Sequence, residues 1–503
     1  MLSTKSPVLM FQTIVSSLAG YISLFFILRF IGPLYWGYLS YALAFGGMLS
    51  LILDLGFNTT YLKFVSQDTD KKADLSTIVF IKVVLNLIYV VAIVGSLLIW
   101  VYVLKKGFEN PIEFWAILTI IPYFSFQSLI PVLTSYFRST FQSFKLAVPR
   151  LIESLFRNLI FVVLGILFML HMEGRIGINV VIVLAFFYDV SYFMYLVILF
   201  MFGKPWHFKK SGKRDYAKYI KFALPLSLST SLGIINLSVD KIIVQFFWGA
   251  VATGALYADQ RMVSIIGSLS GPVGMFLIPL LSTHNAKDSK EYDRDVIEYE
   301  RILSLLAMPF VLAFFLLSPF ILNLLNATYI SYWPSFSIIA VGAYLTVLIQ
   351  PFSSSIASMG KQWVMARISL ISIVLNIAMN LVLIPNEIFG FKLFGLGVEG
   401  ATISFTVCQL ISYAMNKELH RKLNKNRTKS TFSIHLLIAL PTGILFLFSA
   451  FYVRPYPFML LFPIVLAGFA LYALMSILTK EITMYQVKTI IKNLIPNSRS
   501  GLQ

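Results

Sequence analysis

The sequence is poor in charged residues and in cysteine, and both shortages narrow the class of protein. Only 12% of its 503 residues are charged, whereas soluble domains carry about 25%. With 58% hydrophobic residues, a water-soluble fold of this length would expose too much apolar surface, so soluble enzymes and nucleic-acid binders are excluded. The single cysteine, Cys408, excludes a disulfide framework. The five histidines are too scattered to predict a metal site, and no cofactor is predicted.

In place of charged residues, the sequence contains many long apolar runs. A membrane-spanning helix needs about 20 predominantly apolar residues, and runs this long favour helices over barrel strands. The sequence therefore predicts an all-α polytopic membrane protein embedded in the lipid bilayer. The fourteen predicted spans are 9–30, 38–62, 76–104, 112–136, 146–170, 178–202, 219–246, 252–281, 302–322, 334–356, 369–385, 398–415, 432–453 and 457–478.

Acidic residues are scarce, with 22 Asp and Glu against 40 Lys and Arg. If the N-terminus is cytoplasmic, the inner segments and tails, together with Arg150 and Lys221 at the cytoplasmic ends of their spans, hold 30 of these cations, and the outer loops hold 5. This asymmetry follows the positive-inside rule, so both termini are predicted to lie on the cytoplasmic side of the cell membrane. The inner segment 288–301 carries charges of both signs and is predicted to be a solvated helix that extends the ninth span.

A common spacing of 217 residues indicates an internal repeat. It relates two glycine pairs and two arginines: Gly32 and Gly37 with Gly249 and Gly254, and Arg150 with Arg367. Two parallel six-helix lobes around a central cavity are therefore predicted, at 1–206 and 207–430. Residues 431–503 would add two helices and a cytoplasmic tail. The alternative is that tight outer turns simply favour glycine.

Ionisable side chains inside a bilayer cost about 2.5–3.5 kcal/mol at the helix centre, so each needs a partner or a cavity. Arg150, Glu153 and Arg157 share one face of the fifth span. This pattern predicts a net-positive strip facing a cavity or, alternatively, a structural ion pair near the cytoplasmic interface.

Two further arginines are candidates for binding an anionic group. The guanidinium of Arg261, in the eighth span, suits bidentate recognition of phosphate. The alternative is that Arg261 pairs with Asp259 or Asp240. Arg29 lies near the outer end of the first span, where it either faces the cavity or extends to the interface.

Other polar residues lie along helix faces of the spans. Those of the seventh and eighth spans predict contacts with sugars or, alternatively, hydrogen bonds between helices: Ser229, Asn236, Tyr257, Ser264 and Ser268. Four carboxylates are candidates for coupling to H+ or Na+, with capping or internal pairing as the alternative: Asp54, Glu153, Asp189 and Asp240. No nucleotide-binding glycine loop is present, so ATP hydrolysis by that route is not expected.

The order of several short motifs resembles the O-antigen-type polysaccharide-biosynthesis flippases of the multidrug/oligosaccharidyl-lipid/polysaccharide exporter superfamily. The motifs are Arg29-Phe-Ile-Gly-Pro-Leu-Tyr-Trp-Gly-Tyr, Asp54-Leu-Gly-Phe, Asp240-Lys-Ile-Ile-Val, Tyr257-Ala-Asp-Gln-Arg, Asn376-Ile-Ala-Met-Asn and Gly397-Val-Glu-Gly-Ala-Thr. The resemblance implies two lobes that alternate between inward-open and outward-open states. In the related lipid II flippase, cavity arginines occupy the end of span one and a site in span eight. Arg29 matches the first, but Gln260 occupies the second with Arg261 one residue later, which argues against a peptidoglycan precursor.

The residues and the resemblance together predict a flippase for polyprenyl-(di)phosphate-linked oligosaccharide, moving it from the cytoplasmic to the outer leaflet. In this prediction Arg29, Arg157 and Arg261 attract the phosphate, no bond is made or broken, and the protein is not an enzyme. Partners would include glycan polymerase or ligase machinery, but no nucleic acid. Two alternatives stand beside it: a multidrug or cation extruder of the same superfamily, and a membrane-embedded glycan polymerase.

Overall fold

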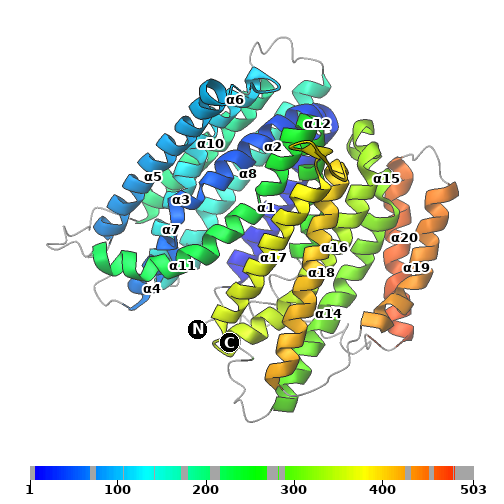
Figure 1. Ribbon diagram of the computed structural model, residues 1–503. Helices are drawn as coiled ribbons and strands as arrows, with labels where there is room; N and C mark the ends of the chain where they lie inside the picture. The colour runs from blue at the N-terminus through cyan, green and yellow to red at the C-terminus, as the bar shows by residue number, and fades with distance from the viewer. Residues whose placement is uncertain are drawn as a thin grey trace, which may run out of the picture. The chain divides into compact units, whose positions relative to one another are not determined.

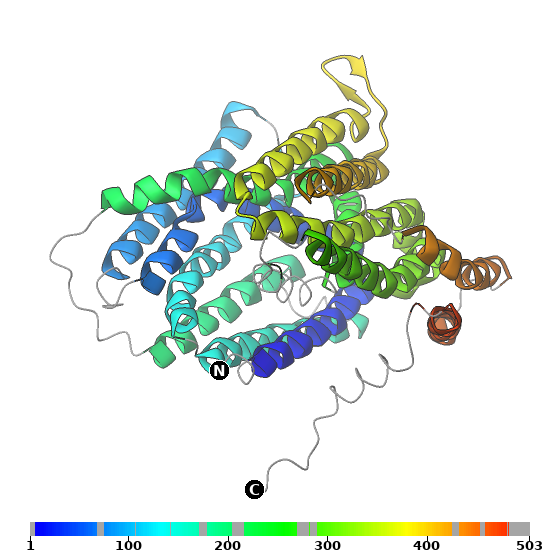
Figure 2. The ribbon, with the colours of Figure 1, turned by 90° about the horizontal axis from the view of Figure 1, so that it is seen from below.

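Helices account for nearly all of the residues that the computed structural model describes (Figure 1). The structure describes residues 6–67, 75–105, 107–140, 142–170, 179–203, 216–268, 281, 289–424, 432–452, 458–479 and 481. Within these ranges the only strands are β1 (Glu387–Ile388) and β2 (Phe391–Lys392), which pair antiparallel. They form a small hairpin beyond the end of α17 (Gln362–Leu383), coloured yellow in Figure 2.

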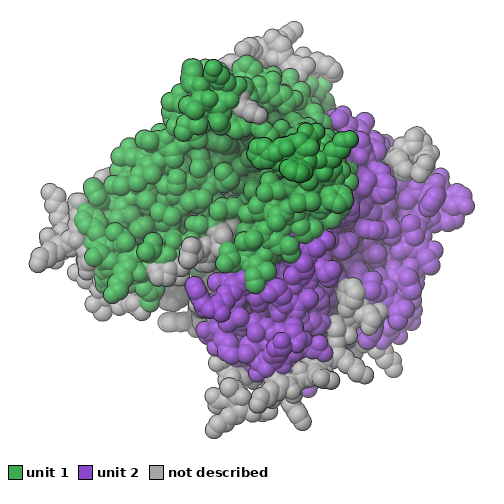
Figure 3. Space-filling model, in the orientation of Figure 1, with its two compact units in different colours: residues 1–262, 369–404 green, residues 263–368, 405–503 purple. Residues whose placement is uncertain are grey.

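The chain divides into two compact units, shown in different colours in Figure 3. Unit 1 contains residues 1–262 and 369–404, and therefore the hairpin and most of α17. Its other helical elements are α1 (Ser6–Phe26), η1 (Ile27–Ile31), α2 (Gly32–Leu49), α3 (Leu51–Asp54), α4 (Phe57–Gln67), α5 (Leu75–Leu98), η2 (Ile99–Val103), α6 (Pro111–Thr119), α7 (Ile121–Ser139), α8 (Ser143–Met169), α10 (Val180–Gly203), α11 (Tyr216–Asn236) and most of α12 (Val239–Ser268). Within the unit, α8 packs against α1 and α10, and α10 also packs against α6 and α7.

Unit 2 contains residues 263–368 and 405–503. Its helical elements are α14 (Ser289–Leu316), α15 (Ser318–Leu325), η4 (Ala327–Tyr332), α16 (Trp333–Ser358), most of α18 (Gly397–Asn424), α19 (Phe432–Tyr452) and α20 (Phe458–Leu478). Helix α14 packs against both α16 and α19, and α20 packs against α19 and α15. The predicted lobe boundaries at 206 and 430 remain predictions, and most of the tail lies outside the described residues.

The predicted fold class is confirmed: the chain is an all-helical polytopic membrane protein. Eleven helical stretches among the described residues are long and apolar enough to cross a membrane. Two of them, Phe11–Asp54 and Gly233–Ser268, each include parts of two predicted spans. Helix α18 covers the predicted span 398–415. The total of fourteen spans stays a prediction.

The two glycine motifs related by the 217-residue spacing adopt the same backbone conformation and contact each other within unit 1. Gly32 has a φ of 81° and Gly249 a φ of 78°, values that favour glycine. A Cβ built on Gly37 would lie 1.8 Å from the carbonyl oxygen of Ala250, and one built on Gly254 would lie 2.1 Å from that of Pro33. Because Ala250 and Pro33 are also 217 residues apart, the contact is reciprocal, as expected for two copies of one structural element.

The expectation of a solvated helix at 288–301 is correct about the helix and about one face of it, on which Arg294 and Glu298 are exposed, but wrong for two of its acids. Helix α14 begins at Ser289, but Asp293 and Glu300 are buried in unit 2. Asp293 Oδ1 lies 2.7 Å from His420 Nε2, and Glu300 Oε1 accepts a hydrogen bond of 3.0 Å from the Lys417 ammonium. Burial lowers the pKa of His420 despite the neighbouring carboxylate. Partners on α18, distant in sequence, therefore allow these acids to be buried.

Candidate functional site

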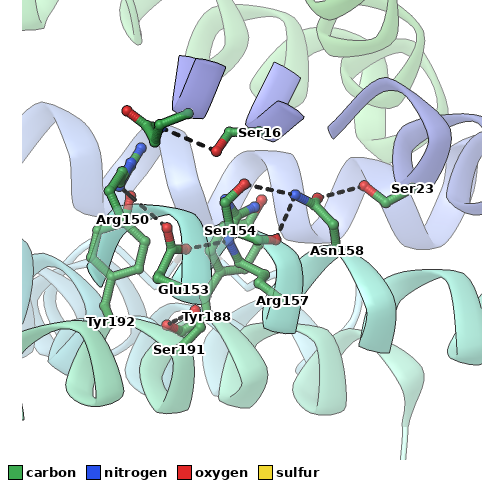
Figure 4. Close-up of polar contacts among 11 residues, drawn as sticks. Ser16, Ser23, Arg150, Glu153, Ser154, Arg157, Asn158, Tyr188, Ser191 and Tyr192 are labelled. Carbon is green, nitrogen blue, oxygen red and sulfur yellow. Dashed lines mark hydrogen bonds and ion pairs between the residues drawn. The ribbon is translucent and has the colours of Figure 1, made fainter. Parts of the chain in front are cut away.

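The polar face of α8 carries the arginine strip predicted from the sequence. Arg157 Nε donates a hydrogen bond of 2.8 Å to Glu153 Oε1, and Arg150 lies 3.3 Å from Glu153 Oε2 (Figure 4). The Glu153 side chain is fully buried, whereas that of Arg157 is 17% exposed. Since two guanidinium groups share one carboxylate, the strip combines an internal ion pair with a net positive charge.

Tyrosine side chains of α10 contact these guanidinium groups. Tyr188, Tyr192 and Tyr195 follow one another at helical spacing on α10. Arg150 donates a hydrogen bond of 3.2 Å to the Tyr192 hydroxyl, and Arg157 lies 5.2 Å from the centroid of the Tyr188 ring. These tyrosines are not among the residues predicted from the sequence, although their spacing places them on one helix face.

Arg261, on α12 in unit 1, is also surrounded by tyrosines. Its guanidinium lies 4.9 Å from the Tyr257 ring centroid and donates a hydrogen bond of 2.5 Å to the hydroxyl of that ring. Tyr257 is fixed in turn by stacking on Trp36, with centroids 5.3 Å apart. Tyr188 packs beside Arg157, whose guanidinium lies 5.2 Å from its ring centroid, and Arg157 and Arg261 are both among the charged groups in its surroundings. We name Arg150, Arg157, Arg261 and their tyrosines the arginine–tyrosine cluster.

This cluster has the chemistry of a site for an anionic group. Guanidinium groups keep their charge when buried, and their planar donors match the oxygen geometry of phosphate. The tyrosines add hydroxyl donors and aromatic faces that stabilise a guanidinium partly removed from water. Among His, Cys, Asp and Glu of the described segments, no group of three is arranged to hold a metal ion.

The remaining predicted cavity residues are less closely connected to the cluster. Arg29 lies half-buried in η1, a short π-helical turn, and its role in phosphate binding stays a prediction. Asn236 is half-buried near the end of α11, and the Ser229 side chain is outside the described residues. Ser264 and Ser268 fall in unit 2, and Ser268 donates to the Ile265 carbonyl of its own helix at 2.6 Å.

Each candidate coupling carboxylate in unit 1 has an internal partner. Besides Glu153 with its arginines, Asp189 accepts a hydrogen bond of 2.8 Å from the backbone amide of Tyr123. Asp240 accepts one of 2.5 Å from Gln260. Gln260 is thus bonded to a carboxylate at the start of its own helix, α12. The coupling role of these carboxylates stays a prediction.

Asp54 pairs with a buried lysine that was not among the residues predicted from the sequence. The Lys82 ammonium, fully buried on α5, donates a hydrogen bond of 2.6 Å to the Leu53 carbonyl and lies 3.6 Å from Asp54 Oδ1. The same oxygen accepts a hydrogen bond of 3.0 Å from the Asn58 amide at the start of α4. Asp54 therefore caps one helix and neutralises a cation from another.

We expect Lys82→Met to lower the free energy of unfolding by about 2–4 kcal/mol, because it removes the buried partner of Asp54 and of the Leu53 carbonyl. The melting temperature of the purified protein in detergent measures this effect. Lys63→Met, at an exposed lysine of α4, is the matched control. Adding Asp54→Asn should recover part of the loss. Equal melting temperatures for Lys82→Met and Lys63→Met would show that the pair contributes no stability.

The fold and the cluster together define a polytopic helical membrane protein with a cationic group of side chains inside unit 1. Similar folds are found in the lipid II flippase MurJ in an inward closed conformation and in an inward-facing multidrug resistance MATE family transporter of the MOP superfamily. The first matches with a TM-score of 0.72 at 15% identity, over 94% of this chain and 98% of that one. The second matches with a TM-score of 0.57 at 13% identity, over 82% and 96%.

Residues 3–285 match the family model of the polysaccharide biosynthesis proteins, which is more than half of the chain. The chain belongs to this family. A relative in Klebsiella pneumoniae, described as an uncharacterized membrane protein in the cps region, is 23% identical over 234 residues. That match covers 45% of this chain, and the chain spans 46% of the length of this relative.

Proposed function

We propose that the protein is a flippase that moves polyprenyl-(di)phosphate-linked oligosaccharide from the cytoplasmic to the outer leaflet of the cell membrane. The observation that carries this proposal is the arginine–tyrosine cluster, a net-positive group of side chains within apolar helices of unit 1. Membership of the polysaccharide biosynthesis family supports a glycan as cargo, and the shared fold supports transport rather than catalysis.

The physical problem that such a protein solves is the transfer of a charged, hydrated headgroup across about 30 Å of hydrocarbon. Arg150, Arg157 and Arg261 replace part of the hydration of the phosphate by charge-assisted hydrogen bonds. The polyprenyl tail remains in lipid throughout, so only the headgroup needs a polar path. An ion gradient or the membrane potential, worth about 2.3 kcal/mol per charge per 100 mV, would drive the cycle.

The test is a leaflet-accessibility assay in proteoliposomes. A polyprenyl diphosphate-linked disaccharide with a fluorescent NBD label on its sugar is placed in both leaflets, and external dithionite destroys the label in the outer one. Without transport, the inner pool stays protected. With active protein, we expect nearly all of the label to be destroyed, while NBD-labelled phosphatidylcholine stays protected.

Two results would contradict this proposal. The flippase function is contradicted if the sugar–lipid stays protected from dithionite in the presence of folded protein and an imposed potential or pH gradient. Gradient-driven accumulation of ethidium without movement of the sugar–lipid would favour the multidrug or cation extruder instead. In cells, a deletion strain should lose surface glycan and accumulate the intact lipid-linked precursor.

A further inference from the structure

A second polar site lies in unit 1, apart from the arginine–tyrosine cluster. It is a cavity of about 620 Å³ between residues of α2, η2, α6 and α12, with Asn386 from the segment that precedes the hairpin. This size falls within the range of small-ligand sites, about 300–1,000 Å³. Its loop residues, Gly107 to Glu109 and Asn386, belong to predicted outer loops, so the cavity is expected at the outer side of the membrane.

Two carboxylates from the beginning of α6 and the loop before it line this cavity. Glu113 is buried, and its Oε1 accepts a hydrogen bond of 3.2 Å from the Gln245 amide of α12. Glu109 Oε2 accepts one of 3.1 Å from the backbone amide of Ala250. Asn110 lies between them and caps α6 by accepting a hydrogen bond of 3.0 Å from the Ile112 amide. This cap fixes the start of the helix and with it both carboxylates.

Two polar atoms in the cavity wall have no hydrogen-bond partner among the residues that the structure describes. Gln245 is only 7% exposed, yet its Oε1 has no hydrogen-bond partner among the described residues. The indole N–H of Trp100, another lining residue, also has none within that part of the chain. Since buried polar groups normally find partners, one acceptor and one donor at the same cavity point to a ligand with hydroxyl or amide groups.

The negative charge and the aromatic side chains of the cavity lining restrict the class of ligand that can bind there. The lining contains two carboxylates and, among the described residues, no Lys, Arg or His. An anionic ligand is therefore disfavoured. Six of the lining residues are aromatic, and the Trp248 ring is held in place by a hydrogen bond of 2.8 Å to the Ile384 carbonyl. Rigid aromatic faces beside carboxylate and amide oxygens suit a sugar ring, which has apolar C–H faces and hydroxyl edges.

We propose that this cavity is a binding site for neutral or amino sugar residues. Its role in transport, which rests on the proposed function, is to hold the sugar end of the cargo at the outer side while the phosphate is released. The cavity thereby selects against uronic acids and other acidic sugars at the position that it binds. Binding itself needs no transport and can be measured independently.

The test is titration calorimetry of the full-length protein in detergent. The probes are N,N′-diacetylchitobiose, glucosamine and glucuronate. We expect heat from the first two and none from glucuronate. Gln245→Leu and Trp100→Phe each remove one unsatisfied polar group while keeping most of the side-chain volume, and each should weaken binding by about tenfold. Trp115→Phe, at an exposed tryptophan of α6 that does not line the cavity, should bind like the wild type.

The outcomes separate this inference from the proposed function. If Gln245→Leu and Trp100→Phe bind sugar and flip the sugar–lipid like the wild type, the proposed sugar site is wrong and the proposed flippase function still holds. If the wild-type protein binds sugar but does not flip the sugar–lipid, and these variants lose sugar binding, the sugar site is supported and the flippase function is contradicted. Heat from tetraethylammonium but none from chitobiose would overturn the sugar assignment in favour of a cation site, and binding of glucuronate as tight as that of chitobiose would overturn the selection against acidic sugars.

Discussion

Replacing Arg157 with alanine is expected to reduce the flipping rate of the polyprenyl diphosphate-linked disaccharide by about 30- to 5,000-fold. Arg157 Nε donates to Glu153 at 2.8 Å, and its guanidinium packs beside the Tyr188 ring. Its loss leaves one arginine on α8 against one carboxylate, so the strip becomes neutral. Removing one side of a desolvated, hydrogen-bonded charge pair costs about 2–5 kcal/mol, which corresponds to this range of rates.

The dithionite assay measures this effect on protein that elutes as a single folded species. Arg157→Lys keeps the charge but loses the planar donors, so an intermediate rate is expected. Arg421→Ala removes an exposed arginine of α18 that pairs with Glu418 and should leave the rate unchanged. If Arg157→Ala lowers the melting temperature but the folded fraction flips at the wild-type rate, the strip is a structural ion pair and not a phosphate site.

Replacing Gly37 with alanine is expected to destabilise the protein by about 3 kcal/mol or more. The added Cβ would lie 1.8 Å from the carbonyl oxygen of Ala250, so the first turns of α2 and the part of α12 that follows the kink at Gly249 must separate. Overpacking commonly costs about 1–3 kcal/mol. The upper end or beyond is expected here because the obstacle is backbone rather than a flexible side chain. Gly254→Ala, which meets the Pro33 carbonyl, should have an effect of the same size.

Melting temperature and yield of monodisperse protein in detergent measure the effect. Gly95→Ala on α5 is the matched control, since a Cβ there meets no atom within 4 Å. Its expected effect is neutral or slightly stabilising. Because both alanines disrupt the same contact, the double variant Gly37→Ala/Gly254→Ala should lose less free energy of unfolding than the sum of the losses in the two single variants. A Gly37→Ala variant as stable as Gly95→Ala would contradict the close approach of the two motifs.

The buried polar groups differ in kind between the two units. Unit 1 holds the arginine–tyrosine cluster, in which cations exceed carboxylates along α8. Unit 2 instead pairs acids of α14 with His420 and Lys417 of α18. We expect anion recognition to depend on unit 1, because its strip retains uncompensated positive charge within apolar helices.

Features that depend on neighbouring residues along one helix could be predicted from the sequence. The apolar runs predicted membrane helices because the backbone must satisfy its own hydrogen bonds in lipid. The ion pairing of Glu153 with Arg157 followed from spacing alone, since residues four apart always share a helix face. The common conformation of the glycine turns was likewise indicated by their repeated spacing.

Features that depend on which helices pack together could not be predicted. Asp54 meets Lys82, and Arg150 meets Tyr192, across separations of 28 and 42 residues in sequence. The acids of α14 were expected in solvent because their partners on α18 are more than a hundred residues away. Helical periodicity specifies the face on which a side chain lies, but it does not specify the helix opposite that face. The sequence by itself therefore determined the membrane class and the cationic strip, whereas tertiary packing decided the tyrosine partners, the burial of the α14 acids and the outer cavity.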